Sequence, residues 1–140
     1  MAVRSYDPAQ VSIIFAGIPI EGFADGTFLT VARNNQGFNM TVGSDGEGAR
    51  AKSNDGGGTA TVTLLQSSIS NDALSAIANL DELSGDGVGP LMIKDGSGRT
   101  LVVAESAWVQ KQPDAEFGRE ISNRVWVFES DNLIMFSGGN

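Results

Sequence analysis

The chain has 140 residues, which is the usual size of a single domain. It contains no cysteine and no histidine, which excludes disulfides, thiolate or imidazole metal sites and the commonest general base. Nine basic and 17 acidic residues give a formal net charge of −8, so tight binding to nucleic acid is not expected, because phosphate affinity comes from lysine and arginine.

Segments with the two-residue period of β-strands follow one another along the chain. The expected strands cover residues 11–15, 27–34, 59–67, 90–95, 100–112 and 123–130, with a last short strand or an apolar tail at 132–139. In the third strand threonines alternate with Ala60, Val62 and Leu64. This alternation predicts one solvated face and one packed face.

Five Asp-Gly pairs separate these segments, and this dipeptide suits tight turns because both residues tolerate a positive φ. They begin at Asp25, Asp45, Asp55, Asp86 and Asp95. The last pair lies in the segment 94–100, which is predicted to join two paired strands. So many turn signals between short strands indicate a fold dominated by β structure.

A single amphipathic helix is predicted over about 71–84. Ser70 or Asn71 is the expected N-cap, Asp72 suits the positive end of the helix dipole, and Gly85 is the expected stop. The apolar residues with helical spacing are Ala73, Leu74, Ile77, Ala78 and Leu80. The predicted fold class is α+β, β-dominated: residues 1–140 form one domain, a small antiparallel β-barrel or sandwich with one flanking α-helix and a long glycine-rich arm between strands.

The glycine-rich arm is predicted at 43–58, within the stretch GSDGEGARAKSNDGGGT. A phosphate loop would need a Gly-Lys-Ser/Thr ending, and a calcium loop of the EF-hand type would need regularly spaced ligands and a closing glutamate. Both patterns are missing here. Plain turn chemistry is the preferred interpretation of its Asp-Gly pairs.

Candidate catalytic groups have no distinctive spacing. Glu116 with Glu120, or Glu105 with Glu129, are the carboxylate pairs that a glycosidase would use. Any acidic protein offers such pairs, and a serine triad would have no histidine as its base. We therefore expect no enzyme activity and predict no catalytic, cofactor-binding or metal-binding residues.

The apolar strands near the C-terminus favour a binding surface or an assembly. In 123–130 both faces begin with apolar residues, so a helix or a neighbouring subunit is expected to cover the second face. Trp108 and Trp126 suggest an alternative, a monomeric β-sandwich module that binds carbohydrate or a protein ligand. No stretch approaches the roughly 20 apolar residues of a membrane span, and no secretion signal is evident at the N-terminus, so a soluble protein made in the cytoplasm is expected.

The stretch ARAKSNDGGGTATVTLLQSSISNDALSAI, residues 49–77, resembles the tail tube proteins of contractile-tailed bacteriophages. It shows an arm of the type Arg-x-Lys-Ser-Asn-Asp, then a threonine-rich strand, then Gln-Ser-Ser and a helix that begins with Asn-Asp. The similarity extends less specifically to residues 6–33 and to the apolar strands near the C-terminus, so it covers most of the chain.

The resemblance implies the tube fold shared with type VI secretion systems. In such tubes six subunits form a ring, their strands join into a continuous β-barrel, and the rings stack inside a tail sheath, with baseplate and tail-terminator proteins at the ends. DNA passes through the lumen without specific binding. The implied location is the virion tail tube, assembled in the host cytoplasm, and the net charge of −8 agrees with an acidic channel wall.

With another copy of the chain as the expected partner, the arm becomes a candidate contact. Its proposed inter-subunit residues are Arg50, Lys52, Ser53, Asn54 and Asp55, which offer ion pairs and hydrogen bonds to a neighbour. The alternative is a mobile surface loop.

Overall fold

The computed structural model describes residues 3–139 and consists mainly of β-strands. A short 3₁₀ helix, Pro8–Gln10, precedes β1. The other elements are β1 (Val11–Phe15), β2 (Ile18–Ile20), β3 (Leu29–Arg33), β4 (Phe38–Val42), β5 (Gly48–Lys52), β6 (Gly58–Leu65), α1 (Ser70–Ser84), β7 (Gly89–Asp95), β8 (Leu101–Lys111), β9 (Asn123–Ser130) and β10 (Leu133–Phe136). The strands expected from the sequence are all present, whereas β2, β4 and β5 were not predicted.

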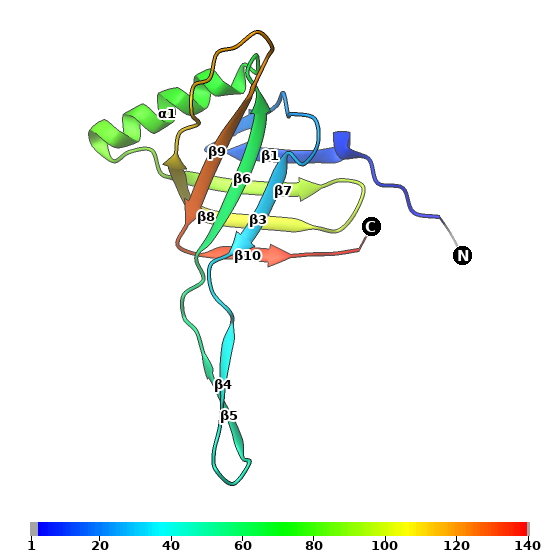
Figure 1. Cartoon of the computed structure of the whole chain (residues 1–140), viewed down its shortest axis with the longest axis vertical. Coiled ribbons are helices and arrows are strands. Elements are labelled where there is room, and N and C mark those ends of the chain that lie inside the picture. Colours follow the sequence, from blue (N-terminus) through cyan, green and yellow to red (C-terminus); the bar gives the residue numbers. More distant parts are fainter. Residues whose placement is uncertain (1–2, 140) are drawn as a thin grey trace.

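The body is one antiparallel sheet folded into two layers. The strand order is β2-β1-β7-β8-β9-β6-β3, and β10 pairs with β8. The long strand β8 links the layers, because its first part pairs with β7 and β10 and its last part, from Ala107 onward, pairs with β9. Figure 1 shows β9, β6 and β3 crossing steeply over β1, β7 and β10.

The hydrophobic core lies between the two layers. Trp126 and Phe128 of β9 are buried with Phe15 of β1, and the rings of Phe15 and Phe128 are 4.9 Å apart. The alternation predicted for β6 is confirmed, since Ala60, Val62 and Leu64 are at most 2% exposed and the threonines between them are half-exposed. The predicted fold class, β-dominated α+β with one helix, is therefore confirmed.

The helix α1 covers one side of the body and packs against β2 and β8. Leu74 and Ala78 are buried and Ile77 packs at the edge of the core. Leu80, which the spacing placed on the same face, is 49% exposed. The helix ends where expected, at Gly85, whose φ of 75° is left-handed and therefore suits glycine.

The predicted N-cap is wrong. The N-cap position is Ile69, which makes no side-chain capping bond, and Ser70 is already the first helical residue. The reason is tertiary: Ser70 Oγ accepts a bond from the backbone N–H of Glu21 at 2.9 Å, and Asn71 Nδ2 donates to the Leu65 carbonyl oxygen at 3.0 Å. Asp72 lies in the first turn, as expected.

Asn71 also fixes the helix to the core. Its Oδ1 accepts a hydrogen bond of 2.9 Å from Nε1 of Trp126, so the one polar atom of a tryptophan that is 1% exposed is satisfied. This buried position leaves Trp126 no free ring face for a ligand.

The glycine-rich segment is an ordered two-stranded hairpin. The strands β4 and β5 pair in register from Phe38 opposite Lys52 to Val42 opposite Gly48, and a turn at 43–47 joins them. The predicted arm boundaries, 43–58, therefore omit the whole first strand. Figure 1 shows the hairpin projecting from one end of the body.

Candidate functional site

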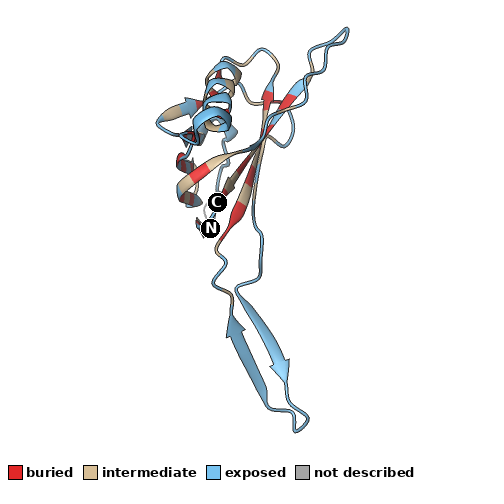
Figure 2. Ribbon diagram, turned by 90° about the vertical axis from the view of Figure 1, so that its left-hand side faces the viewer, coloured by how far each residue is buried: buried red, intermediate tan, exposed pale blue. Residues whose placement is uncertain are grey.

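The hairpin arm, residues 34–57, is the most exposed part of the molecule. Every residue of β4 and β5 is exposed, and Figure 2 shows the two strands well separated from the buried core. A lone two-stranded hairpin is at best marginally stable in water. A segment built in this way is suited to gain further contacts from a partner.

The two faces of the arm differ in chemistry. Because opposed residues in an antiparallel pair share a face, Phe38, Met40 and Val42 lie on the same side as Arg50 and Lys52. These three apolar side chains are 44%, 75% and 55% exposed. The other face carries Asn39, Thr41, Ala49 and Ala51. One face of the arm is therefore apolar and basic, and the other is small and polar.

The predicted arm residues fall into two groups: Arg50 and Lys52 lie on β5, whereas Ser53, Asn54 and Asp55 lie where the arm joins the body. Arg50 lies over the ring of Phe38, with its guanidinium carbon 4.1 Å from the ring centre. Neither Arg50 nor Lys52 has a carboxylate partner within residues 3–139, where the single ion pair joins Lys111 and Asp114. Apart from the contact of Arg50 with the Phe38 ring, both basic groups remain available to a carboxylate of another molecule.

Ser53 and Asp55 instead form hydrogen bonds within the segment that joins the arm to the body. The Ser53 N–H donates to the Gly37 carbonyl oxygen at 2.8 Å, while Asp55 accepts from the Asn35 side chain and from the Gly57 N–H. The structure gives Asp55 internal partners, and Asn54 is exposed. The Asp-Gly pairs act as turns here, since Asp45 Oδ1 likewise accepts from the Glu47 N–H at 3.1 Å.

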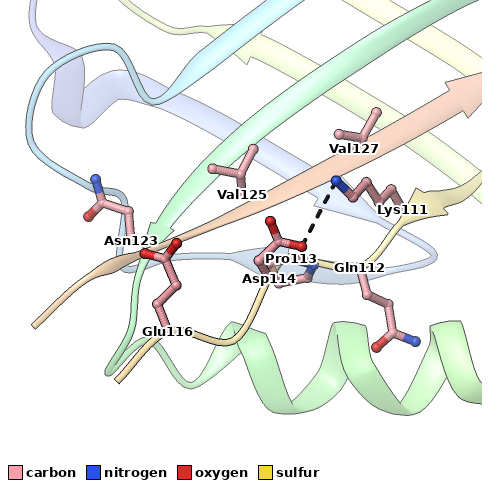
Figure 3. A pocket seen from close by; sticks show the side chains of 8 residues that line it. All are labelled: Lys111, Gln112, Pro113, Asp114, Glu116, Asn123, Val125 and Val127. Carbon is pink, nitrogen blue, oxygen red and sulfur yellow. Dashed lines mark ion pairs between the residues drawn. The ribbon is translucent and has the colours of Figure 1, made fainter. Parts of the chain in front are cut away.

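A groove lies at the other side of the body, beneath the start of the β8–β9 loop. Figure 3 shows Val125 and Val127 on β9 and, across this strand from their side chains, Asp114 and Glu116 on the neighbouring segment. The groove has a volume of about 400 Å³ and is also lined by Gln112, Pro113 and Asn123. Its lining therefore mixes two valines with charged and polar residues.

Arg124 holds the β8–β9 loop in place, a role that was not predicted from the sequence. It is only 8% exposed, and its guanidinium donates to Ser122 Oγ at 2.7 Å and to the Glu116 carbonyl oxygen at 3.1 Å. It also lies 5.5 Å from the ring of Phe117. Despite these bonds the loop leaves Phe117 and Ile121 82% and 67% exposed.

An apolar row crosses the solvent side of the other sheet layer. Pro19 opposes Ile14, Ile14 opposes Met92, Met92 opposes Val103, and Val103 opposes Ile134. Ile14, Met92 and Ile134 are 38%, 45% and 58% exposed. Contiguous apolar surface of this kind is typical of proteins that associate.

The candidate catalytic pairs are not gathered into a closed site. Glu116 and Glu120 lie on the exposed β8–β9 loop, Glu105 is exposed on β8, and Glu129 is half-exposed on β9 beside Trp108. In residues 3–139 there is no group of three or more acids placed to hold a metal ion. Nor does the described part of the chain contain a helix long and apolar enough to cross a membrane.

Both comparisons by sequence match proteins of bacteriophages. The protein family described as "Bacteriophage PhiTE tail tube protein" matches residues 15–136. The chain is also 33% identical, over 144 aligned positions, to "Structural protein ORF10" of Pseudomonas phage KPP10, and the match covers 97% of this chain and 83% of that protein.

Comparison by structure gives the same fold at low identity. The anti-feeding prophage tube-terminating cap matches with a TM-score of 0.65 at 11% identity, covering 98% of this chain and 95% of the other. The sheath/tube terminator of the extracellular contractile injection system PVC matches at 0.63 and 10%, covering 98% and 100%. A chain of the PVC sheath-tube complex matches at 0.59 and 11%, covering 95% and 92%.

Proposed function

Because the chain belongs to the bacteriophage PhiTE tail tube protein family, we propose that it builds the inner tube of a contractile tail from stacked hexameric rings. The observation that carries the proposal is the family match over residues 15–136, most of the chain. The fold shared with tube and terminator proteins supports it, and so does an arm with no cover of its own. The role is structural, without catalysis.

Free strand edges support closure into a ring. In the layer β8-β9-β6-β3, the strand β3 pairs only with β6 among the described residues. At the other edge β8 continues to Lys111, whereas its pairing with β7 ends at Ala107. Pairing of β3 in one subunit with the end of β8 in the next continues the sheet around a channel, and such a head-to-tail contact closes when the rotation is right.

The charge of the chain suits a channel that conducts DNA. A net charge of −8 repels phosphates over about a Debye length, roughly 8 Å at physiological salt. A passing polymer then meets no lysine-rich wall that would hold it. In this proposal the tail sheath surrounds the tube, baseplate and tail-terminator proteins contact its ends, and the virion tube is assembled in the host cytoplasm.

The proposal is tested by the state of the purified protein. We expect negative-stain electron microscopy to show rings with six subunits or tubes built from them, and light scattering to rise with protein concentration. A protein that stays monomeric at high concentration in every salt condition would contradict the proposed function.

A further inference from the structure

We infer that a pocket between Arg4 and Arg99 binds the acidic C-terminal end of α1 from the adjacent copy of this chain within a ring. This arginine pocket is lined by Arg4, Ser5, Gly139 and residues 96–99, which form the turn between β7 and β8. The inference rests on the proposed assembly into rings. It adds a contact between ring neighbours that is made by side chains rather than by paired strands.

Two guanidinium groups come together in the arginine pocket. A Cβ placed on Gly139 would lie 3.1 Å from Nη2 of Arg99 and 3.6 Å from Nη1 of Arg4, so both groups approach one point. The pocket has a volume of about 420 Å³. Like charges held this close repel each other. A carboxylate placed between them removes this repulsion and accepts hydrogen bonds from both arginines.

No acid within residues 3–139 pairs with either arginine, because the single ion pair of these residues lies elsewhere, at the end of β8. Two acids are close in the sequence, but their oxygens have other partners. Asp95 Oδ1 accepts from the Ser97 N–H at 3.0 Å and from Ser97 Oγ at 2.8 Å. Asp7 Oδ1 accepts from the Ala9 N–H at 3.0 Å. In a chain with a net charge of −8, two adjacent arginines without a carboxylate partner indicate a site for an acid of another molecule.

The C-terminal end of α1 carries the complementary charge. Its last turn contains no basic residue, although the carbonyl groups at this end of a helix concentrate negative charge. Glu82 in this turn and Asp86 just beyond it add two exposed carboxylates, and neither has an ion-pair partner within the described residues. Leu83, between them in the sequence, is 88% exposed. An arginine from outside would neutralise both the carboxylates and the helix end.

The apolar groups of the two surfaces also match. Val3 and Tyr6 flank Arg4 and Ser5 in the sequence and are 93% and 59% exposed. Leu83 at the helix end offers them an apolar side chain of similar exposure. The contact therefore combines a desolvated apolar part with opposite charges beside it, an arrangement that strengthens ion pairs by removing water from around them.

The two surfaces lie on opposite flanks of the body. Figure 1 shows α1 descending toward its C-terminal end on one flank, while the β7–β8 turn and the segment before β1 lie on the other. One copy therefore cannot fill its own pocket. The end of β8 lies beside α1, and β3 forms the edge of its layer toward the opposite flank (Figure 1). Pairing of β3 with the end of β8 in the next copy thus turns the same two flanks toward each other, in a head-to-tail contact.

A charge exchange tests the contact. Arg99→Glu places like charges together, so we expect the protein concentration needed for assembly to rise about tenfold. Adding Glu82→Arg restores opposite charges and should recover most of this loss. The control Lys94→Glu changes the net charge equally from an exposed site on β7 and should assemble like the natural sequence. Calorimetry on dilute protein should give the natural Tm for every variant, because the three side chains are exposed.

Cross-linking tests the position. The chain has no native cysteine, so an introduced pair reports its contact without background. In Val3→Cys/Leu83→Cys we expect mild oxidation of the assembled protein to give covalent oligomers of up to six copies on a non-reducing gel, because the contact runs around one ring. The matched control is Val3→Cys/Ala76→Cys. Ala76 is also exposed but lies about 10 Å before Leu83 along α1, too far for the same disulfide.

The outcomes separate the two proposals. If the natural sequence forms no rings or tubes, the proposed function fails and this inference fails with it. The inference requires both recovery of assembly by the charge exchange and cross-linking specific to the Leu83 pair. If rings or tubes form and either result is missing, the arginine pocket does not receive the helix end, and the proposed function stands without it.

Discussion

Excision of the arm is expected to separate folding of the body from assembly. Residues 38–52 are removed so that Gly37 joins Ser53, two residues already linked by a 2.8 Å backbone hydrogen bond. Every residue of the two excised strands is exposed, so the core loses nothing. The cut removes 15 of the 24 residues between Arg33 and Gly58 and leaves 9, which lowers the loop-closure cost by about 0.9 kcal/mol.

The excised variant should therefore unfold at the natural temperature or up to about 4 °C above it, given the usual change in Tm for that free energy. Calorimetry on dilute protein measures this, and light scattering with negative-stain microscopy measures assembly, which should be absent. A fall in unfolding free energy of more than about 2 kcal/mol would mean that the arm is part of the folding unit. Normal tubes without the arm would refute its role in assembly.

Two further predictions concern stability of the body. Trp126→Phe removes the indole N–H and leaves Asn71 Oδ1 without this donor, so urea unfolding should show a free energy of unfolding lower by about 1–3 kcal/mol. Asn71→Leu should lower it less in the Trp126→Phe background than alone, and strictly additive losses would show that the hydrogen bond contributes nothing to stability. Gly58→Ala places a Cβ 2.5 Å from Leu133 Cδ2, so overpacking should lower the free energy of unfolding by about 1–3 kcal/mol. An unchanged urea midpoint would show that β10 shifts to accommodate the methyl group without loss of stability.

The sequence predicted the strands whose alternation is decided by burial. In β6 and β9 every second residue enters the core, so the pattern of Ala60, Val62 and Leu64 or of Trp126 and Phe128 is visible in the chain itself. The helix was visible for the same reason, and its end was marked by Gly85. The Asp-Gly turns between short strands likewise indicated the β-dominated fold class that the structure confirms.

The arm strands were not predicted, and both are exposed along their whole length. In β4 the apolar residues Phe38, Met40 and Val42 alternate with Asn39 and Thr41, so a strand signal was present in the sequence but was missed between the flanking glycines. The groove was not predicted either, since Val127 and Glu116 come to line it only through the path of the β8–β9 loop. The N-cap prediction was wrong because the side chains of Ser70 and Asn71 form hydrogen bonds with residues distant in the sequence, and local helix propensity does not include such bonds.

The position of the arm gives any stack of these molecules a direction. Within residues 3–139 the arm leaves one end of the body and no second hairpin leaves the other (Figure 1), so a column of copies stacked in one direction has two unlike ends, one that carries exposed hairpins and one that does not. A protein that starts such a column must match one end, and a protein that stops it must match the other. Initiation and termination thus require different binding chemistries, although every layer between them is built from the same chain.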